Sequence, residues 1–288
     1  MKVVELFGHD RPVFSFEFFP PRTDKGFETL FRTIADLKRL DPGFVSVTWG
    51  AGGSTRRKTI ELVSRIQREA GLTAMAHLTC VGASREELGE VLDRLRDEGI
   101  ENVLPLRGDP PKDQPDFQPA PGGFRHANEL LEFIHTRWSF CTPAACYPET
   151  HIEAPSPEAD LQNLLRKVEA GADFLITQLF FDNADYFAFV ERARAAGIRV
   201  PIVAGIMPIT GTTNVPRIAK MCGARIPDEL QAAIDAAGGN PERTDAVGVE
   251  WATLQCRELL EHAVPGIHFY TLNRSPATRR IHESLFPG

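Results

Sequence analysis

The residue with the clearest chemical potential is Glu17, a carboxylate inside the aromatic run FSFEFF at residues 14–19. Such a run favours a β-strand, and the two prolines that follow end it. Side chains alternate across a strand, so Glu17 and Ser15 share one face and the phenylalanines at 14, 16 and 18 share the other. Burying an ionised carboxylate alone is very costly, so Glu17 is paired, protonated or catalytic. A salt-bridged core residue is an equally good interpretation of this stretch by itself.

Other polar residues recur at the ends of further apolar, strand-like segments. These segments span residues 44–48, 74–78, 103–106, 140–145, 174–178, 202–205 and 267–271. The polar residues at or just past their ends are Thr48, His77, Arg107, Asp109, Tyr147, Gln178, Asn273 and Arg274. Each has an ordinary explanation alone: His77 as a hydrogen-bonded core histidine, Arg107 and Asp109 as an ion pair. Together with Glu17 they recur at seven strand ends, which favours an enzyme over a binding module.

The elements that must position these residues alternate between helix and strand. Amphipathic segments end at Gly71, Gly99, Gly171 and Gly197, and an apolar strand follows each glycine. Eight such strands predict an α/β fold, a (β/α)8 TIM barrel, as one domain over residues 1–288 with extra helices before the last strand. The active site of such a barrel lies at the C-terminal strand ends, where the polar residues fall. A doubly wound sheet is the alternative, but no G-x-G-x-x-G follows the first strand.

Composition narrows the class of protein. The 288 residues are 42% hydrophobic and 25% charged, which is typical of a globular protein with a large core. A formal net charge of -7 argues against nucleic-acid or anionic-membrane binding. No transmembrane run or signal peptide is visible, and five cysteines without paired metal spacing indicate reduced thiols. We therefore expect a cytoplasmic protein.

Two classes of catalysis find little support in the residue spacing. The histidines have no H-x-H or H-E-x-x-H grouping, so a metal site is not expected. There is no G-x-S-x-G elbow and no cysteine with an obvious partner base. A buried carboxylate among hydrogen-bonding groups suits proton donation to a substrate beside a cofactor, and the reaction itself stays open on these residues alone.

Several longer motifs carry a family resemblance. They are FSFEFFPPR (14–22), VSVTWGAGGS (45–54), HLTC (77–80), LRGDPP (106–111), YPETH (147–151), DLxNLxRK (160–167), ITQLFFD (176–182), GIMP (205–208) and HFYTLNR (268–274). In this order, over nearly the whole chain, they resemble the methylenetetrahydrofolate reductase family in its bacterial catalytic form. The resemblance implies a single FAD-binding barrel without a regulatory domain.

The implied activity is reduction of 5,10-methylenetetrahydrofolate to 5-methyltetrahydrofolate by NADH or NADPH. In this family bound FAD carries the hydride in a ping-pong reaction, an oxidoreduction of CH-NH donors that supplies methyl groups for methionine synthesis. The implied partners are the folate and the nicotinamide, in a homo-oligomer, without nucleic acid, membrane or metal. FAD lying across barrel loops would account for the missing dinucleotide fingerprint.

The resemblance also assigns roles to residues. Glu17 matches the catalytic acid that helps open the substrate's five-membered ring, and Asp109 matches a residue that binds the pterin near the flavin and tunes its potential. The substrate-binding matches are Glu17, Asp109, Gln178 and Arg274. The cofactor-binding matches are Thr48, Trp49, His77, Arg107, Gly108, Asp109, His126, Ala127, Tyr147, His151, Ala154, Asp160, Asn163, Arg166 and Lys167.

Three departures and several alternatives accompany this resemblance. Trp49 stands where the family commonly has Tyr, and His126-Ala127 where it often has Tyr-Ala. The loop at 209–215 does not align, so no residue there is assigned to the nicotinamide. The alternatives are another flavin barrel such as a proline dehydrogenase, a flavin-free folate-binding or methyl-transferring barrel, and a non-catalytic partner subunit.

Overall fold

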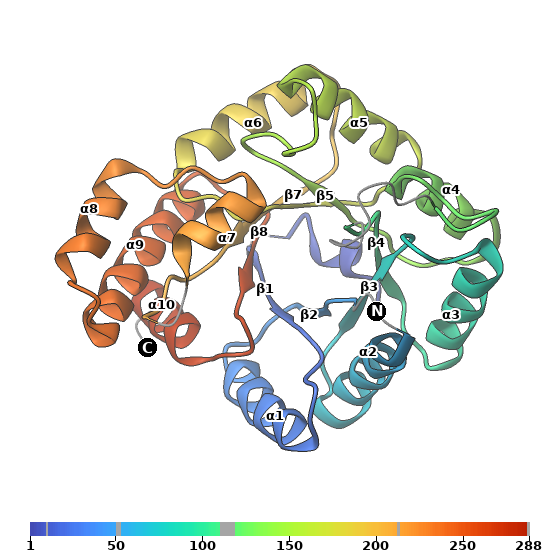
Figure 1. Cartoon of the computed structure of the whole chain (residues 1–288), viewed down its shortest axis with the longest axis horizontal. Helices are drawn as coiled ribbons and strands as arrows, with labels where there is room; N and C mark the ends of the chain where they lie inside the picture. The colour runs from blue at the N-terminus through green and yellow to red at the C-terminus, as the bar shows by residue number, and fades with distance from the viewer. Residues whose placement is uncertain (10, 50–52, 110–118, 212–213, 287–288) are drawn as a thin grey trace.

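A ring of eight parallel strands surrounded by helices forms the protein (Figure 1). The computed structural model describes residues 1–9, 11–49, 53–109, 119–211 and 214–286. Its strands are β1 (Val13–Phe18), β2 (Phe44–Val47), β3 (Ala74–Thr79), β4 (Asn102–Leu106), β5 (Ala144–Cys146), β6 (Leu175–Thr177), β7 (Ile202–Ile206) and β8 (Gly266–Tyr270). The predicted TIM barrel is confirmed.

The strand order is β4-β3-β2-β1-β8-β7-β6-β5. A parallel bridge between Asn102 and Cys141 joins the two ends of this series and nearly closes the barrel. β1 therefore lies between β2 and β8, with Glu17 in register with Ser46 on one side and Tyr270 on the other. The first and last strands of the barrel are direct neighbours.

The helices follow the strands around the outside. They are α1 (Asp24–Lys38), α2 (Gly53–Arg65), α3 (Arg85–Asp97), α4 (Ala127–Arg137), α5 (Pro157–Glu169), α6 (Asn183–Ala195), α7 (Val215–Cys222), α8 (Asp228–Ala236), α9 (Pro241–Glu261) and α10 (Pro276–Leu285). Local sequence sets their ends: Ser156 accepts a hydrogen bond from Ala159 N and Pro157 opens α5. Within the described ranges, no helix is both long and apolar enough to span a membrane.

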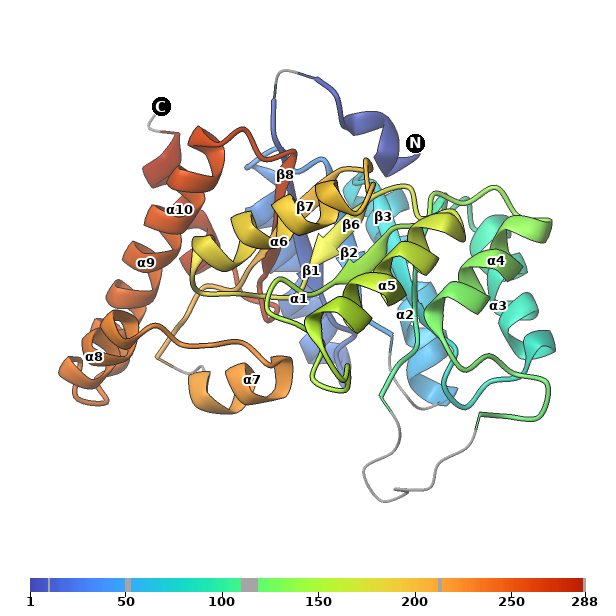
Figure 2. The same ribbon diagram turned by 90° about the horizontal axis from the view of Figure 1, so that it is seen from above.

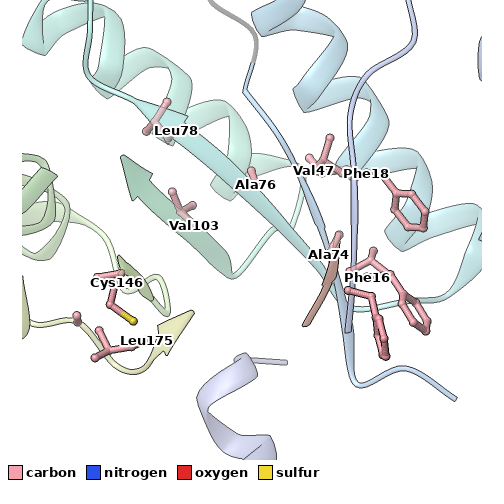
Figure 3. Packing of buried hydrophobic residues seen from close by; sticks show 14 of the residues in the cluster. Phe16, Phe18, Val47, Ala74, Ala76, Leu78, Val103, Cys146 and Leu175 are labelled. Atoms are coloured by element: carbon pink, nitrogen blue, oxygen red, sulfur yellow. The ribbon is translucent and has the colours of Figure 1, made fainter. Parts of the chain in front are cut away.

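The two faces of each strand have different environments. Phe14, Phe16 and Phe18 of β1 belong to the cluster between strands and outer helices, as alternation predicts. Figure 3 shows part of this cluster, with Phe18 close to Val47 of the neighbouring strand. Ser15 and Glu17 consequently lie on the inner side of the barrel.

An apolar plug fills the end of the barrel at which the strands begin. Val13, Phe44, Met75 and Phe174 are buried there with residues of the short 3-10 helix η1 (Val3–Leu6). The ring of Phe7 lies 5.0 Å from that of Phe174. Figure 2 shows η1 and α7 on opposite sides of the barrel. The far end is therefore sealed, and chemistry is confined to the end near α7.

Two boundaries differ from the sequence expectation. The strand expected at 140–145 begins only at Ala144, because Pro143 lacks an N–H and Thr142 N donates to the Asp173 carboxylate instead. The helical region expected at 213–263 is three separate helices. Gly223, at φ 70°, closes the first of them, because left-handed backbone suits glycine.

Candidate functional site

Glu17 lies at the inner face of the barrel, near its open end, between two histidines. Its Oε2 is 3.6 Å from His77 Nε2 of β3 and 3.8 Å from His268 Nε2 of β8. The Glu17 side chain is 21% exposed, whereas both histidines are buried. The carboxylate can therefore meet a ligand while imidazoles flank it from inside the barrel. His77 was predicted as a site residue; His268 was not.

His77 is neutral at physiological pH. Burial lowers the pKa of its imidazole to about 4, and the nearby Glu17 carboxylate opposes this shift only in part. Its Nε2 is buried without a hydrogen-bond partner among the described residues. A buried polar atom in this state is costly unless a ligand or a small movement satisfies it. Glu17 Oε2, 3.6 Å away, is an acceptor that a small movement would bring within hydrogen-bond distance.

A cleft of about 330 Å³ opens at the same end of the barrel, along β4, β5, the start of α4 and one side of α5. It contains ten of the residues that the family resemblance assigns to the cofactor: Arg107, His126, Ala127, Tyr147, His151, Ala154, Asp160, Asn163, Arg166 and Lys167. Asn128 and Glu153 also line it and were missed by the sequence reasoning. The structure thus brings residues from three separate motifs into one cavity.

Cationic groups concentrate in this cleft although the chain carries a net charge of -7. Arg107 donates to Glu153 across 2.9 Å, which keeps its guanidinium at the cleft wall. Lys167 is half-buried and donates to the Ala145 carbonyl, and burial lowers the pKa of its ammonium group. An anionic ligand would relieve that desolvation, because an opposite charge favours the charged form.

Aromatic and hydrogen-bonded contacts hold the cleft's remaining wall. The rings of Tyr147 and His151 meet edge to face at 4.6 Å. The Asp160 carboxylate accepts from His151 N, which ties the loop before α5 to the helix itself. Tyr147 is nearly buried, and desolvation raises the pKa of its hydroxyl well above the ordinary value. Tyr147 therefore stays a neutral hydrogen-bonding group.

Five predicted cofactor residues do not line this cleft. His77 lies on β3 beside Glu17, and Thr48, Trp49, Gly108 and Asp109 follow the ends of β2 and β4. Thr48 N donates to Phe18 O, and Trp49 packs against the outer core. Gly108 has φ 82°, and a Cβ there would lie 2.5 Å from Val81 Cγ1. Asp109 is exposed. These positions form another part of the open end.

Asp109 and Glu17 face a common neighbour on α7. Burial, and then the carboxylates of Asp109 and Glu17, raise the pKa of the Cys222 thiol to about 11. Cys222 packs with Tyr270 and Met207 in the apolar cluster beneath α7. α7 therefore lies across the open end with both predicted catalytic carboxylates near its last turn. All five cysteines are unpaired, as expected.

Gln178 and Arg274 occupy two further edges of the open end. Gln178 Oε1 accepts from Leu179 N, which fixes its amide. Arg274 lines a second cavity of about 370 Å³ with Phe19, Leu272 and Arg280 among its walls. Asn273 joins this wall to β1, because its amide donates to Phe19 O at 2.8 Å and accepts from Phe19 N at 2.9 Å. Asn273 therefore has a structural role at the end of β1.

Two of the missed residues, His268 and Glu153, have partners that are distant in sequence. His268 follows the inward alternation of β8 and precedes Tyr270 by two positions, so strand periodicity could have placed it inside the barrel. Glu153 lies in a loop, and nothing local indicates that it pairs with Arg107. The alternative in which Arg107 pairs with Asp109 is not what the structure shows, since the ion pair of Arg107 is with Glu153.

Comparisons with known proteins point to one family. The family model "Methylenetetrahydrofolate reductase" matches residues 2–286. The chain is 41% identical to methylenetetrahydrofolate reductase (NADH) 1 of Arabidopsis thaliana over 283 residues, covering 94% of this chain and 48% of the relative. It is 38% identical to 5,10-methylenetetrahydrofolate reductase of Escherichia coli over 274 residues, covering 94% of this chain and 90% of the relative. The chain thus spans about half the length of its plant relatives.

Solved structures add support for the fold. An uncharacterized protein from Clostridium thermocellum that binds two copies of 5-methyl-5,6,7,8-tetrahydrofolic acid superposes with a TM-score of 0.64 at 12% identity, covering 98% of this chain and 95% of that one. A dihydropteroate synthase from Coxiella burnetii superposes with a TM-score of 0.53 at 11% identity, covering 96% and 93%. The match over residues 2–286, with relatives near 40% identity, shows that this chain belongs to the methylenetetrahydrofolate reductase family.

Proposed function

We propose that the protein reduces 5,10-methylenetetrahydrofolate to 5-methyltetrahydrofolate, with FAD as its bound cofactor and a reduced nicotinamide as its electron source. Family membership over residues 2–286 is the observation that carries this proposal. The barrel supports it with a carboxylate at the open end and a cationic cleft beside it.

The cleft's chemistry fits FAD. Arg107, Arg166 and Lys167 line the cleft and are proposed to bind the diphosphate, because guanidinium and ammonium groups form charge-assisted hydrogen bonds with phosphate oxygens. Tyr147 and His151 offer aromatic surface, and Asn163 offers an amide. Within this proposal Thr48, Trp49, His77, Gly108 and Asp109 contact the cofactor nearer the barrel axis. When bound, FAD supplies alternating hydride acceptance from the nicotinamide and release to the folate.

Glu17 is the proposed acid. Protonation of a substrate nitrogen opens the five-membered ring and prepares the one-carbon unit for reduction, so an acid at the open end is required. Glu17 fits this role because its side chain is partly exposed at the open end of the barrel and its backbone is held in β1. Asp109 and Gln178 are proposed to hydrogen-bond the pterin, whose ring carries both donors and acceptors.

Arg274 is proposed to bind the carboxylate tail of the folate. Its guanidinium suits bidentate pairing with a carboxylate. The cavity that it lines is walled by the exposed side chains of Phe19 and Leu272, which offer apolar contact for an aryl ring. The folate would then extend from the barrel axis, at Glu17, outward to Arg274.

Family membership also supports proposals about the reductant and the cellular context. The names of the plant relatives specify NADH, which favours NADH over NADPH for this chain. We further propose that the protein is a cytoplasmic homo-oligomer that supplies methyl groups for methionine synthesis. Size-exclusion chromatography would test the oligomeric state, and turnover with NADH and with NADPH would test the reductant.

An anaerobic absorption experiment tests the main proposal. Purified protein supplied with FAD should show flavin bands that bleach with NADH or NADPH and return when methylenetetrahydrofolate is added. Bleaching without recovery would indicate an oxidoreductase with another acceptor, such as a proline dehydrogenase run in reverse. Absence of flavin binding would refute the proposal in favour of a flavin-free barrel.

A further inference from the structure

The interior of the barrel is polar on the side of Glu17. Around Glu17, the strands β8, β1, β2 and β3 contribute buried polar side chains: His268, Ser15, Ser46 and His77. The next strand, β4, places Leu104 in register with His77, and Leu104 belongs to the apolar plug. Burying a polar side chain lowers stability unless it has a hydrogen-bond partner. The presence of these four groups on neighbouring strands therefore needs a physical reason.

Contacts from three directions fix the ring of His268. It stacks on Phe44 at 5.7 Å with planes 12° apart and meets Tyr270 edge-on at 5.5 Å. Its Nδ1 lies 2.7 Å from Ser15 Oγ. The side chain is only 1% exposed. The ring therefore has one orientation, and its Nε2 lies toward Glu17.

Ser15 lies where its hydroxyl can select the tautomer of His268. The Ser15 hydroxyl has one proton and two acceptors in reach, Nδ1 at 2.7 Å and the Ile267 carbonyl at 3.5 Å. The shorter contact is the stronger hydrogen bond, and in the arrangement that we infer Oγ donates to Nδ1. In the neutral imidazole the proton then lies on Nε2, which is 3.3 Å from Ser46 Oγ and 3.8 Å from Glu17 Oε2. This N–H is shared between the serine oxygen and the carboxyl group.

His77, which lies on β3, approaches the same carboxyl oxygen of Glu17. Its otherwise unpartnered Nε2 is 3.6 Å from Glu17 Oε2. Among the described residues both close imidazole contacts are thus to Oε2. These distances exceed a hydrogen bond, and catalytic contacts are often long in an unliganded site and shorten when the ligand binds.

Resting on the proposed function, we propose that His268, oriented by Ser15, is a positioning residue for Glu17. With His77 it holds Oε2 as the oxygen that accepts hydrogen bonds, so the acidic proton resides on Oε1. In the transfer the Oε1–H bond breaks, a bond forms between that proton and the substrate nitrogen, and the electron pair stays on the carboxylate. The two imidazole N–H groups then stabilise the resulting charge.

A purely structural histidine is the competing explanation, and paired variants separate the two. His268→Gln places an amide N–H near the position of Nε2, whereas His268→Asn is one carbon shorter and reaches only toward Ser15. Both should lose similar packing against Phe44. We expect His268→Asn to slow reoxidation of the reduced flavin by methylenetetrahydrofolate about 10- to 100-fold, as small misplacements of reacting groups do. His268→Gln should recover most of that loss.

Stopped-flow absorbance would measure the two half-reactions separately. Flavin reduction by NADH should change less than about twofold in either variant, and folate Kd less than about threefold, since both bind without the Glu17 proton. Equal rates for the two variants in folate reoxidation, or equal losses in both half-reactions, would overturn the positioning role. A wild-type protein without any folate half-reaction would instead refute the proposed function.

A second pair keeps the test decisive if the histidine variants do not fold. Ser15→Ala removes the group that selects the tautomer, whereas Ser46→Ala removes a same-sized hydroxyl that contacts only Nε2. Both serines are completely buried, so the packing loss is matched. Folate reoxidation should slow more in Ser15→Ala than in Ser46→Ala. The reverse order would contradict the inference.

Discussion

Replacing Glu17 by Gln tests the chemistry at the open end of the barrel most directly. The amide has nearly the same shape as the carboxyl group and can lie between His77 and His268 as the carboxylate does. The side chain is 21% exposed, so the substitution creates no cavity and buries no new group. Glu17→Gln should therefore fold and bind FAD like the wild type.

The loss in rate follows from the role of the proton. General acid catalysis by a positioned side chain contributes about 10²- to 10⁴-fold, which corresponds to about 3 to 5 kcal/mol in the barrier. Because Gln cannot donate this proton, the folate half-reaction should slow by that factor. Reduction of the flavin by the nicotinamide needs no proton from Glu17 and should stay within about threefold of the wild-type rate.

Anaerobic stopped-flow absorbance at the flavin band separates the two rates. Protein reduced by a stoichiometric amount of NADH is mixed with methylenetetrahydrofolate, and the return of the band gives the second rate. Glu17→Asp is a useful control, since it keeps an acid but withdraws it by one methylene. If Glu17→Gln reoxidised with folate at the wild-type rate, or lost both half-reactions equally while folded, the assignment of the acid would be wrong.

Four further outcomes are expected. Lys167→Met should weaken FAD binding about 10- to 100-fold in titrations of the apoprotein, because a charge-assisted hydrogen bond contributes about 1.5–3 kcal/mol; unchanged affinity would remove Lys167 from the phosphate site. Asp109→Asn should raise the flavin midpoint potential in a dye-coupled titration, because a negative charge near the flavin disfavours its anionic reduced form; no shift would place Asp109 away from the flavin. Acid should destabilise the fold through His77, whose pKa is about 4 in the folded protein and 6.5 ordinarily. As the pH falls, the unfolded chain therefore binds a proton first. Stability that is present above pH 6.5 is lost toward pH 4. That loss is about 2 kcal/mol between pH 7 and pH 5, and thermal unfolding of His77→Asn should show a correspondingly smaller acid effect. Phe174→Ala should lower the free energy of unfolding by about 3–5 kcal/mol in urea, because the ring is fully buried between Phe7 and Phe44, and a much smaller loss would mean that the plug can collapse.

Strand alternation and repeated helix ends were sufficient to predict the barrel. The inner position of Glu17 also followed from alternation alone, because a side chain two residues from another on a strand must share its face. Alternation says nothing about which residues face Glu17 across the barrel. His77 and His268 reach it from β3 and β8, and only the strand order brings those strands beside β1 and β2.

The cleft that Arg107 lines shows the same limit of prediction from sequence patterns. Fifteen cofactor-binding residues were predicted from the family resemblance, and ten of them line one cavity. Glu153 was missed because a loop carboxylate has no periodicity to reveal it, yet it is the ion-pair partner of Arg107. The division of 213–263 into three helices was missed for a related reason: apolar periodicity continues through glycines whose left-handed backbone breaks the helix.

The adjacency of β1 and β8 has a consequence for the order of folding. Glu17 and His268 are separated by nearly the whole chain, and β1 gains its second neighbour only when residues from Gly266 onward are available. Contacts this remote in sequence form late, since a large loop must close before they can form. During synthesis one edge of β1 therefore stays unpaired until the last strand emerges from the ribosome. The pairing that completes the barrel is also the one that brings Ser15, Glu17 and His268 together, so an unfinished chain lacks this polar centre.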